Sequence, residues 1–526
     1  MATIDTLNRT QAANPAEGGA KRRAGWAGAA SVGLALGVTE LAAGLVDKVP
    51  SALASVGRYV VDYAPPGTKD IAVDLFGTGD KGALAIGTTI IAVVIGVFVG
   101  RVALRRPAAG TLAFGLFGLL GVGAALSQPL ISPILTILAI GVAAWLGWWT
   151  LTKLLAAVRF RPAESPTDGL PADPGRRRFT GVVTGVGAVA VAGGAGGRWL
   201  IVRRSEEAIG STTIPGAAPA PTLGAGTSFD GINGLAPIVI PNDDFYRIDT
   251  ALVVPRVDPA TWQLEVNGMV DRPLSFSLDD LLGRDLVEEY VTIACVSNEV
   301  GGHLVGNALW SGVRLADVLD EAGVQAGATQ IVGTSVDGFT AGFPTEVAFD
   351  GREPLIAVGM NGEALPARHG YPARLIVPGL YGYVSATKWI SEITLTTWED
   401  FDGYWIPRGW SKEGPIKTQS RIDHPRNGEE ISGVDTVIAG VAWAPTRGVA
   451  RVEVRIDGGE WLEAELTTPL SDQAWVQWKV DHPVAAGRHL VEVRATDGTG
   501  ETQTADLQAP APNGATGYHD ITFTAV

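Results

Sequence analysis

The residue with the most distinctive chemistry is Cys295, the only cysteine among 526 residues. It follows the β-branched run Tyr290-Val-Thr-Ile-Ala and precedes the polar run Val-Ser-Asn-Glu-Val-Gly-Gly. A cysteine at a strand end can face a pocket, where its thiolate is a soft ligand for a transition metal. The alternative is a small buried apolar side chain, the usual fate of a free cysteine. A single cysteine excludes intramolecular disulfides and zinc sites built on CxxC pairs.

Histidine and methionine, the other candidate metal ligands, lie outside the long apolar runs. All six histidines follow residue 300, and the methionines after Met1 are Met269 and Met360. A membrane haem with axial His or Met ligands is therefore not expected. The sequence has no CxxCH motif and no cysteine set for an iron–sulfur cluster. If the protein carries out redox chemistry, it must therefore exchange electrons with another protein or a quinone.

Several segments in the second half of the chain keep a common order and spacing. They are Asp244–Arg247, Val257–Trp262, Tyr290–Gly302, Trp310–Leu315, Met360–Arg374, Pro378–Tyr383 and Lys388–Trp389. These blocks resemble the sulfite oxidase family, with its oxidoreductase molybdopterin-binding domain. The runs Gly440–Trp443 and Arg451–Val454 resemble that family's Mo-co dimerisation domain. The resemblance covers residues 242–526 and suggests a membrane-anchored bacterial member.

The resemblance implies a molybdenum–molybdopterin cofactor in which Cys295 is the only protein ligand to the metal. The metal would cycle between Mo(VI) and Mo(IV) and move an oxygen atom to or from a substrate. The cofactor supplies this chemistry, and the protein orients and tunes it. The resemblance implies catalytic roles for Cys295 and Arg247.

The resemblance also implies a set of cofactor-binding residues. They are Phe245, Tyr246, Arg247, Cys295, Asn298, His369, Arg374 and Lys388. Cations suit a pterin phosphate, because the guanidinium group binds oxyanions through two parallel hydrogen bonds. Taken singly, each cation is an ordinary surface charge and His369 an ordinary loop histidine. Their register with Cys295 favours contact with the cofactor.

Two departures from the family bear on the substrate. In sulfite oxidases an arginine after the ligand cysteine helps bind the sulfite anion, and here that position holds Glu299. The family tyrosine before the Met-Asn-Gly block appears as Val358 or Gly359. A carboxylate in place of a guanidinium disfavours an anion. Sulfite stays a candidate substrate through the resemblance, but this departure favours a neutral S-oxide or N-oxide, or another small oxyanion.

The elements that position these residues follow from charge and hydropathy. Residues 1–204 hold 20 Lys/Arg and 11 Asp/Glu, whereas residues 205–526 hold 20 and 44. The acidic second part argues against nucleic-acid binding, because phosphate repels such a field. We expect a multi-domain protein, with an α-helical membrane domain at 1–204 and a flexible Gly/Ala/Pro-rich linker at 205–240.

Five nearly uncharged runs in the first 204 residues are close to bilayer length. They are Ala24–Val46, Ala83–Gly100, Gly110–Ser127, Ile131–Val158 and the weaker Gly181–Gly197. Glu40 interrupts the first run near its outer end, where we expect it to reach the membrane interface. An intramembrane carboxylate is otherwise a candidate functional group.

The basic clusters predict the orientation of these spans. Residues 21–23, 101–106 and 159–178 lie on one side if the N-terminus is cytoplasmic. The part after residue 204 then lies on the extracytoplasmic side of a bacterial multi-pass membrane protein. Arg176, Arg177 and Arg178 before a mild apolar run also resemble a twin-arginine export signal, which carries folded proteins. An ordinary positive-inside cluster is the alternative.

The acidic part of the chain divides into two folded units. Residues 241–415 mix short alternating strands with helical pieces such as Leu315–Ala322, which predicts an α+β catalytic domain of the sulfite oxidase type. Residues 416–526 alternate throughout, and Ala450–Asp457, Gly458-Gly459 and Trp461–Leu466 predict a β-hairpin. An immunoglobulin-like sandwich that forms a homodimer is expected there.

The leading hypothesis is a membrane-anchored molybdenum oxidoreductase whose partners are a small-molecule substrate, an electron carrier and membrane lipid. A cell-surface receptor or adhesion protein is the first alternative, and metal analysis separates the two. A transporter with an outer regulatory domain is the second. The apolar runs lack the paired ionisable residues that transport sites usually need.

Overall fold

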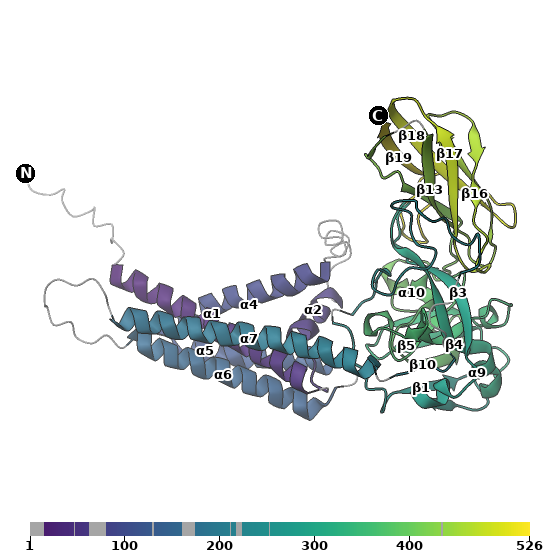
Figure 1. Cartoon of the computed structure of the whole chain (residues 1–526). Helices are drawn as coiled ribbons and strands as arrows, with labels where there is room; N and C mark the ends of the chain where they lie inside the picture. The colour runs from purple at the N-terminus through teal and green to yellow at the C-terminus, as the bar shows by residue number, and fades with distance from the viewer. Residues whose placement is uncertain are drawn as a thin grey trace, which may run out of the picture. The chain divides into compact units, whose positions relative to one another are not determined.

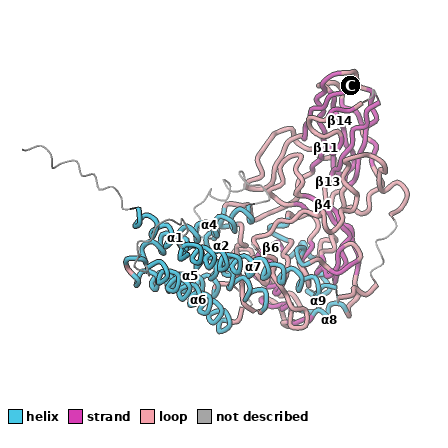
Figure 2. Tube along the Cα trace, turned by 60° about the vertical axis from the view of Figure 1, so that its left-hand side comes forward, coloured by secondary structure: helices cyan, strands magenta, loops and turns pink. Residues whose placement is uncertain are grey.

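The computed structural model describes residues 15–46, 48–62, 80–128, 131–159, 174–210, 212–216, 223–251, 253–432 and 435–526. Contacts divide the chain into two compact units, Met1–Arg204 with Ala251–Val253 and Ser205–Thr250 with Val254–Val526. The first is built of helices and the second mainly of strands and loops (Figures 1 and 2).

The helical unit contains α1 (Pro15–Leu45), α2 (Ala52–Asp62), α4 (Asp80–Arg105), α5 (Pro107–Leu126), α6 (Pro133–Arg159) and α7 (Pro174–Gly210). Within the described ranges, five helical segments are long and apolar enough to cross a membrane: Gly18–Leu45, Gly82–Arg105, Pro107–Leu126, Pro133–Arg159 and Arg177–Arg203. All five predicted apolar runs are thus helical. Arg176, Arg177 and Arg178 lie in the first turns of α7.

Small residues allow the backbones of α1 and α4 to pack closely against each other. A Cβ added at Gly28 would lie 1.9 Å from the Gly96 carbonyl oxygen, and one at Gly100 would lie 2.0 Å from that of Ala24. The two backbones therefore touch where glycine has no side chain, a packing common between membrane helices. Any larger residue at Gly28 would push the helices apart.

Glu40 of α1 is buried inside the helical unit. Its side chain is 6 % exposed, and its Oε1 accepts a hydrogen bond from Ser51 Oγ at 2.6 Å. Ser51 Oγ also accepts the Ala54 N–H at 3.1 Å, at the start of α2. The Ser51 hydroxyl, directly before α2, thus gives the carboxylate a partner inside the protein, and the place of Glu40 relative to a membrane surface stays a prediction.

Two sheets form the α+β part of the second unit. One has the order β2-β1-β10-β5-β6, from β1 (Gln263–Gly268), β2 (Leu274–Ser277), β5 (Gln330–Ser335), β6 (Thr340–Pro344) and β10 (Ile390–Thr396). The other has the order β3-β4-β7-β8, from β3 (Val287–Ala294), β4 (Val305–Arg314), β7 (Leu355–Met360) and β8 (Glu363–Ala364), and β9 (Arg374–Ile376) pairs with β7. β4 and β7 are buried along almost their whole length, as a central pair covered on both faces requires.

Short helices connect these strands. They are α8 (Leu278–Leu282), α9 (Leu315–Ala322), α10 (Gly382–Ser385) and the 3₁₀ turns η2 (Thr345–Ala348), η3 (Ala367–His369) and η4 (Ile406–Arg408). α9 coincides with the predicted helical piece and ends at Gly323, whose φ of 71° suits glycine at a helix C-terminus.

The last part of the unit is a two-sheet β-sandwich. One sheet has the order β11-β13-β17-β16, from β11 (Gln419–His424), β13 (Asp435–Trp443), β16 (Glu465–Leu466) and β17 (Val476–Pro483). The other has the order β12-β19-β18-β14-β15, from β12 (Glu430–Ile431), β14 (Val449–Ile456), β15 (Trp461–Glu463), β18 (Gly487–Asp497) and β19 (His519–Ala525). Both sheets contribute to one apolar core that includes Trp478 and Phe523. The immunoglobulin-like assignment stays a prediction.

The predicted hairpin is confirmed, because β14 and β15 pair antiparallel. Asp457 and Gly458 at the turn both have positive φ, 52° and 72°. Such angles suit the tight turns whose twist matches that of the flanking strands.

Residues 223–240 lie along the strand-rich unit. Phe229 N–H donates to Gln477 Oε1 at 2.8 Å, and Ala236 N–H donates to an oxygen of Asp423 at 3.1 Å. Ile240 N–H donates to the Asn307 carbonyl at 2.9 Å. The composition of this segment predicts a free tether, but polar side chains distant in the sequence fix its backbone.

Candidate functional site

Cys295 is the first residue of the loop between β3 and β4. These strands pair antiparallel to the last residue of β3, so residues 295–304 form their connection. The Cys295 N–H donates to the Leu304 carbonyl at 2.9 Å, and its carbonyl accepts the Asn298 N–H at 3.0 Å. These bonds fix the backbone on both sides of the sulfur.

Asn298 and Glu299 belong to this loop. Asn298 Oδ1 accepts the Leu304 N–H at 2.7 Å and so draws the two ends of the loop together. Glu299 is exposed, and neither residue is among those lining the cavity beside Cys295 in the described part of the chain. The carboxylate that replaces the family arginine thus lies outside the cavity. Contact of Asn298 with a cofactor stays a prediction.

The thiol of Cys295 lies at the wall of a cavity and is only 8 % exposed. Burial raises its pKa, while hydrogen bonds from the Ser297 N–H and hydroxyl and the charge of Lys388 act to lower it. A buried thiolate needs such compensation. The surroundings therefore suit a sulfur that binds a metal cation.

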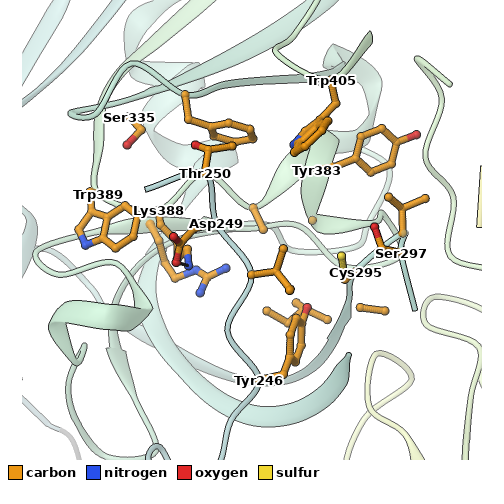
Figure 3. A pocket seen from close by; sticks show the side chains of 18 of the residues that line it. Tyr246, Asp249, Thr250, Cys295, Ser297, Ser335, Tyr383, Lys388, Trp389 and Trp405 are labelled. Atoms are coloured by element: carbon orange, nitrogen blue, oxygen red, sulfur yellow. Dashed lines mark hydrogen bonds and ion pairs between the residues drawn. The ribbon is translucent and has the colours of Figure 1, made fainter. Parts of the chain in front are cut away.

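The cavity brings together four of the predicted site residues: Tyr246, Cys295, Arg374 and Lys388. Figure 3 shows Cys295 between Tyr246 on one side and Tyr383 and Trp405 on the other, with Lys388 and Asp249 at a second end. The other four, Phe245, Arg247, Asn298 and His369, are not among its lining residues. The predicted set thus separates into residues that face the cavity and residues behind it.

Arg374 of β9 is fully enclosed and only partly paired. Its Nη1 donates to the His369 carbonyl at 3.0 Å, and its guanidinium lies 5.0 Å from the centre of the Trp310 ring. Its Nε is buried without a hydrogen-bond partner among the described residues. Burial lowers the pKa of Arg374 to about 10. A buried donor without a protein partner can be satisfied by an ordered water or by a ligand that supplies an acceptor.

Lys388 and Arg247 share one carboxylate, Asp249. Lys388 Nζ and Arg247 Nε each lie 2.8 Å from Asp249 Oδ2. Burial lowers the pKa of Lys388 to about 8, opposed by Asp249 and assisted by Arg374 and Arg247. Two cations thus share one carboxylate at this end of the cavity, and the buried Arg374 lies close enough to lower the pKa of Lys388. No motif in the sequence singles out Asp249.

Phe245 and His369 support the cavity from behind. Phe245 stacks on Tyr246 with ring centres 5.3 Å apart and meets His369 edge-on at 5.7 Å. His369 Nε2 lies 2.8 Å from the Asn242 carbonyl. Burial lowers the pKa of His369 to about 3, so the ring is neutral and Nε2 carries the hydrogen. His369 thus holds the segment that positions Tyr246.

An aromatic wall that the sequence analysis missed completes the cavity. It consists of Phe339, Tyr383, Trp405 and Trp410. Trp410 lies 6.3 Å from Trp405 and 5.9 Å from Tyr383 between ring centres. The Tyr383 hydroxyl donates to the Ser411 carbonyl at 2.6 Å and so holds the loop that carries both tryptophans. In the sequence, only the high density of aromatic residues at 404–410 indicates this wall.

Comparison with known proteins matches two parts of this unit. Residues 251–405 match the oxidoreductase molybdopterin-binding domain, and residues 413–510 match the Mo-co oxidoreductase dimerisation domain. The chain carries the two domains of the sulfite oxidase family of molybdopterin proteins. The family suspected from the motifs is therefore confirmed.

Curated relatives of this molybdopterin protein include sulfite oxidases and nitrate reductases. Mitochondrial sulfite oxidase of Homo sapiens is 32% identical over 302 residues, which cover 48% of this chain and 55% of the relative. An NADH nitrate reductase of Hordeum vulgare is 30% identical over 314 residues, covering 48% and 34%. The chain spans about half the length of the sulfite oxidase it matches.

One solved structure that resembles part of this chain is the sulfane dehydrogenase SoxCD from Paracoccus pantotrophus. It is 24% identical to this chain, with a TM-score of 0.46, and the alignment covers 57% of this chain and 83% of that one.

The cavity fits a molybdopterin cofactor. Among the described residues no group of three or more His, Cys, Asp or Glu side chains converges on a metal position, so a metal beside Cys295 needs further ligands from a cofactor. Within the described ranges of the chain, Arg374 Nε and Thr250 Oγ1 are buried without a hydrogen-bond partner, and both residues line the cavity. A pterin with a phosphate and amide-like edges offers acceptors for such groups.

Proposed function

We propose that this protein is a membrane-anchored, outward-facing molybdenum-cofactor oxidoreductase that transfers an oxygen atom to or from a small molecule. The observation that carries the proposal is the position of Cys295. In a matched molybdopterin-binding domain, its sulfur lines the same cavity as Arg374 and Lys388. A soft sulfur beside buried cations suits an anionic metal cofactor.

Each residue has a separate role in this proposal. Cys295 would be the protein's ligand to molybdenum, and Arg374 and Lys388 would hold the pterin and its phosphate. Phe245 and Tyr246 would frame the pterin, supported by the neutral His369. Arg247 would act through Asp249, which also fixes Lys388. When bound, the cofactor supplies oxygen-atom transfer through its Mo(VI)/Mo(IV) couple.

For the substrate, the cavity favours a neutral S-oxide or N-oxide over sulfite. Glu299 is exposed and offers no cation in place of the family arginine. Lys388 is bound to Asp249, and a second carboxylate, Asp337, also lines the cavity. The aromatic wall offers ring faces to a methylated or apolar group. Reducing such an oxide takes up two electrons and two protons and releases water, so a quinol or an electron-transfer protein must supply the electrons.

The helical unit supports the membrane part of the proposal. Five helices have the length and composition of spans, and the basic clusters favour a cytoplasmic N-terminus. The molybdopterin domains would then lie outside, exported through the signal around Arg177. Replacing the three arginines of that motif with lysine should leave these domains inaccessible to added protease. Normal accessibility in this variant would contradict the export proposal.

The dimerisation-domain match supports a homodimer formed through the C-terminal sandwich. Light scattering of the fragment from residue 242 onward should report a dimer, and the same fragment cut after Pro415 should be a monomer. A monomer in both cases would refute the proposal.

The decisive experiment is purification of the full chain with metal and pterin analysis. One molybdenum and one pterin per chain support the enzyme, whereas their absence after expression in a cofactor-producing host supports a receptor or adhesion protein. A dye-linked screen then compares sulfite oxidation with sulfoxide and amine N-oxide reduction. Faster turnover of sulfite than of either oxide would overturn the substrate proposal.

A further inference from the structure

The C-terminal sandwich contacts the strand that carries Cys295. β3 is the edge strand of its sheet, and residues 471–475 of the sandwich lie along its open edge. Thr292 N–H donates to the Gln473 carbonyl at 3.0 Å, and Trp475 N–H donates to Thr292 Oγ1 at 2.7 Å. Ser471 Oγ donates to the Tyr290 carbonyl at 2.6 Å. An open strand edge offers unpaired backbone groups, and here the sandwich pairs them.

The sandwich also contacts the end of loop 295–304 that lies farther along the chain from Cys295; this loop is called the metal-ligand loop below. Arg421 of β11 donates from Nη1 to the Gly302 carbonyl at 2.9 Å. Gly301, with φ of 74°, lies against the ring of His519, because an added Cβ would be 2.2 Å from its Cδ2. Cys295 therefore lies between two contacts of one domain, on the strand before it and on the loop after it.

These contacts are themselves fixed in place. Arg421 Nε lies 2.6 Å from Asp423 Oδ1, and both side chains are 5 % exposed. His519 Nδ1 accepts the Ile422 N–H at 2.9 Å, which ties the ring to the strand that carries Arg421. A buried, paired guanidinium has little freedom, so its hydrogen bond to the loop defines a position rather than a range of positions.

We propose that the C-terminal domain is a positioning domain for the metal-ligand loop, in addition to any dimer contact. Arg421 and His519 are positioning residues that fix the place of the Cys295 sulfur without facing the cavity. The inference rests on the proposed function, because the place of the sulfur matters for catalysis only if Cys295 binds the metal. The test measures the reactivity of the Cys295 thiol in metal-free protein. Its outcome therefore does not depend on whether the chain binds molybdenum.

The test measures alkylation of Cys295 by iodoacetamide in the full-length chain purified without molybdenum. Because Cys295 is the only cysteine, the rate reports on this loop alone. Arg421→Lys keeps a charge beside Asp423 but shortens the reach to Gly302. His519→Leu removes the acceptor for Ile422, whereas His519→Asn offers an oxygen near the place of Nδ1.

We expect Arg421→Lys and His519→Leu to raise the alkylation rate about tenfold, which corresponds to about 1.4 kcal/mol. His519→Asn should restore a rate close to that of the unchanged protein. The matched control is Arg455→Lys, because Arg455 also pairs with a carboxylate, Glu492, at 2.8 Å in the same domain. Its rate should not change.

A second measurement uses the cofactor-loaded enzyme. Misplacement of the ligand loop should lower kcat while KM for the substrate stays constant, because the aromatic wall is untouched. Equal alkylation rates for Arg421→Lys, His519→Leu and Arg455→Lys would overturn the proposal. A tenfold change in chains that bind no molybdenum would support the positioning role and contradict only the proposed function.

Discussion

The cations of the cavity and those of the C-terminal sandwich differ in what balances their charge. On the sandwich, Arg455 donates to both oxygens of Glu492 at 2.8 Å, and this bond raises its pKa. In the cavity, burial lowers the pKa of Arg374 to about 10 and that of Lys388 to about 8. The surface cation is satisfied by its neighbour, whereas the cavity cations favour the arrival of an anion.

This difference separates residues that stabilise the fold from residues that await a ligand. A buried charge that is incompletely paired costs free energy in the empty protein and is compensated on binding. Variants of the cavity cations should therefore lose cofactor or activity, whereas variants of the sandwich cations should lose only stability.

The largest effect is expected for Cys295→Ser. The variant should lose at least about a hundredfold in kcat, about 2.7 kcal/mol, because an alkoxide is a harder donor than a thiolate. The free energy of unfolding should change little. Dye-linked activity and thermal melting on the same samples measure both. If Cys295 were only a core residue, activity would survive in the folded fraction and stability would fall by about 1–3 kcal/mol.

The next largest effect is expected for Arg374→Met. Loss of the buried guanidinium should lower the cofactor content of purified protein at least about tenfold, or about 1.4 kcal/mol of binding. Thermal melting of the cofactor-free protein should change little, because an apolar side chain of similar length replaces an incompletely paired buried charge. Fluorescence of the released pterin gives the content. Full cofactor content would contradict the role of Arg374.

A pH series compares two histidines with opposite shifts. Burial lowers the pKa of His369 to about 3, with Arg374, Lys388 and Arg368 also lowering it and the Asn242 carbonyl raising it. Its contribution to stability is present above pH 6.5 and is lost as the pH falls towards 3, at up to about 1.4 kcal/mol per pH unit. Denaturant unfolding should show a shallower acid decline in His369→Gln.

His489 of the sandwich is the control for that series. Hydrogen bonds to the Ala485 carbonyl and Asp457 raise its pKa. Its contribution is present below the unfolded pKa and is lost as the pH rises through the raised value. His489→Gln should therefore leave the acid decline in place. An equal change of acid slope in both variants would refute the distinction.

The smallest effect is expected for Arg455→Met. This pair is partly exposed, with 30 % and 21 % of the two side chains accessible. Its loss should lower the free energy of unfolding by less than about 1 kcal/mol and leave the cofactor content unchanged. Denaturant unfolding and pterin fluorescence test both parts, and a loss of cofactor would remove the contrast with Arg374.

Much of the architecture follows from local patterns. The five apolar runs are helices, α9 occupies the predicted segment, and the Ala450–Leu466 region contains the predicted hairpin. An apolar run of about 20 residues and a strict alternation of apolar and polar residues are local patterns. They predict secondary structure correctly because it depends here on residues close together in the chain. The composition of residues 223–240 predicts a tether, but the segment bonds to Gln477 and Asp423, which lie far away in the sequence.

The single thiol, its position after a β-branched strand and the cations in register with it can all be read from the order of the residues. Tertiary structure decided which of them share a cavity. Arg374 and Lys388 line it, His369 turns to the Asn242 carbonyl, and Asn298 closes its own loop. Arg421 meets the Gly302 carbonyl 119 residues away along the chain, and the aromatic wall joins Phe339 and Tyr383 to the loop that carries Trp405 and Trp410. Residue type sets what a side chain can do, but only the packing of distant strands sets which groups it meets.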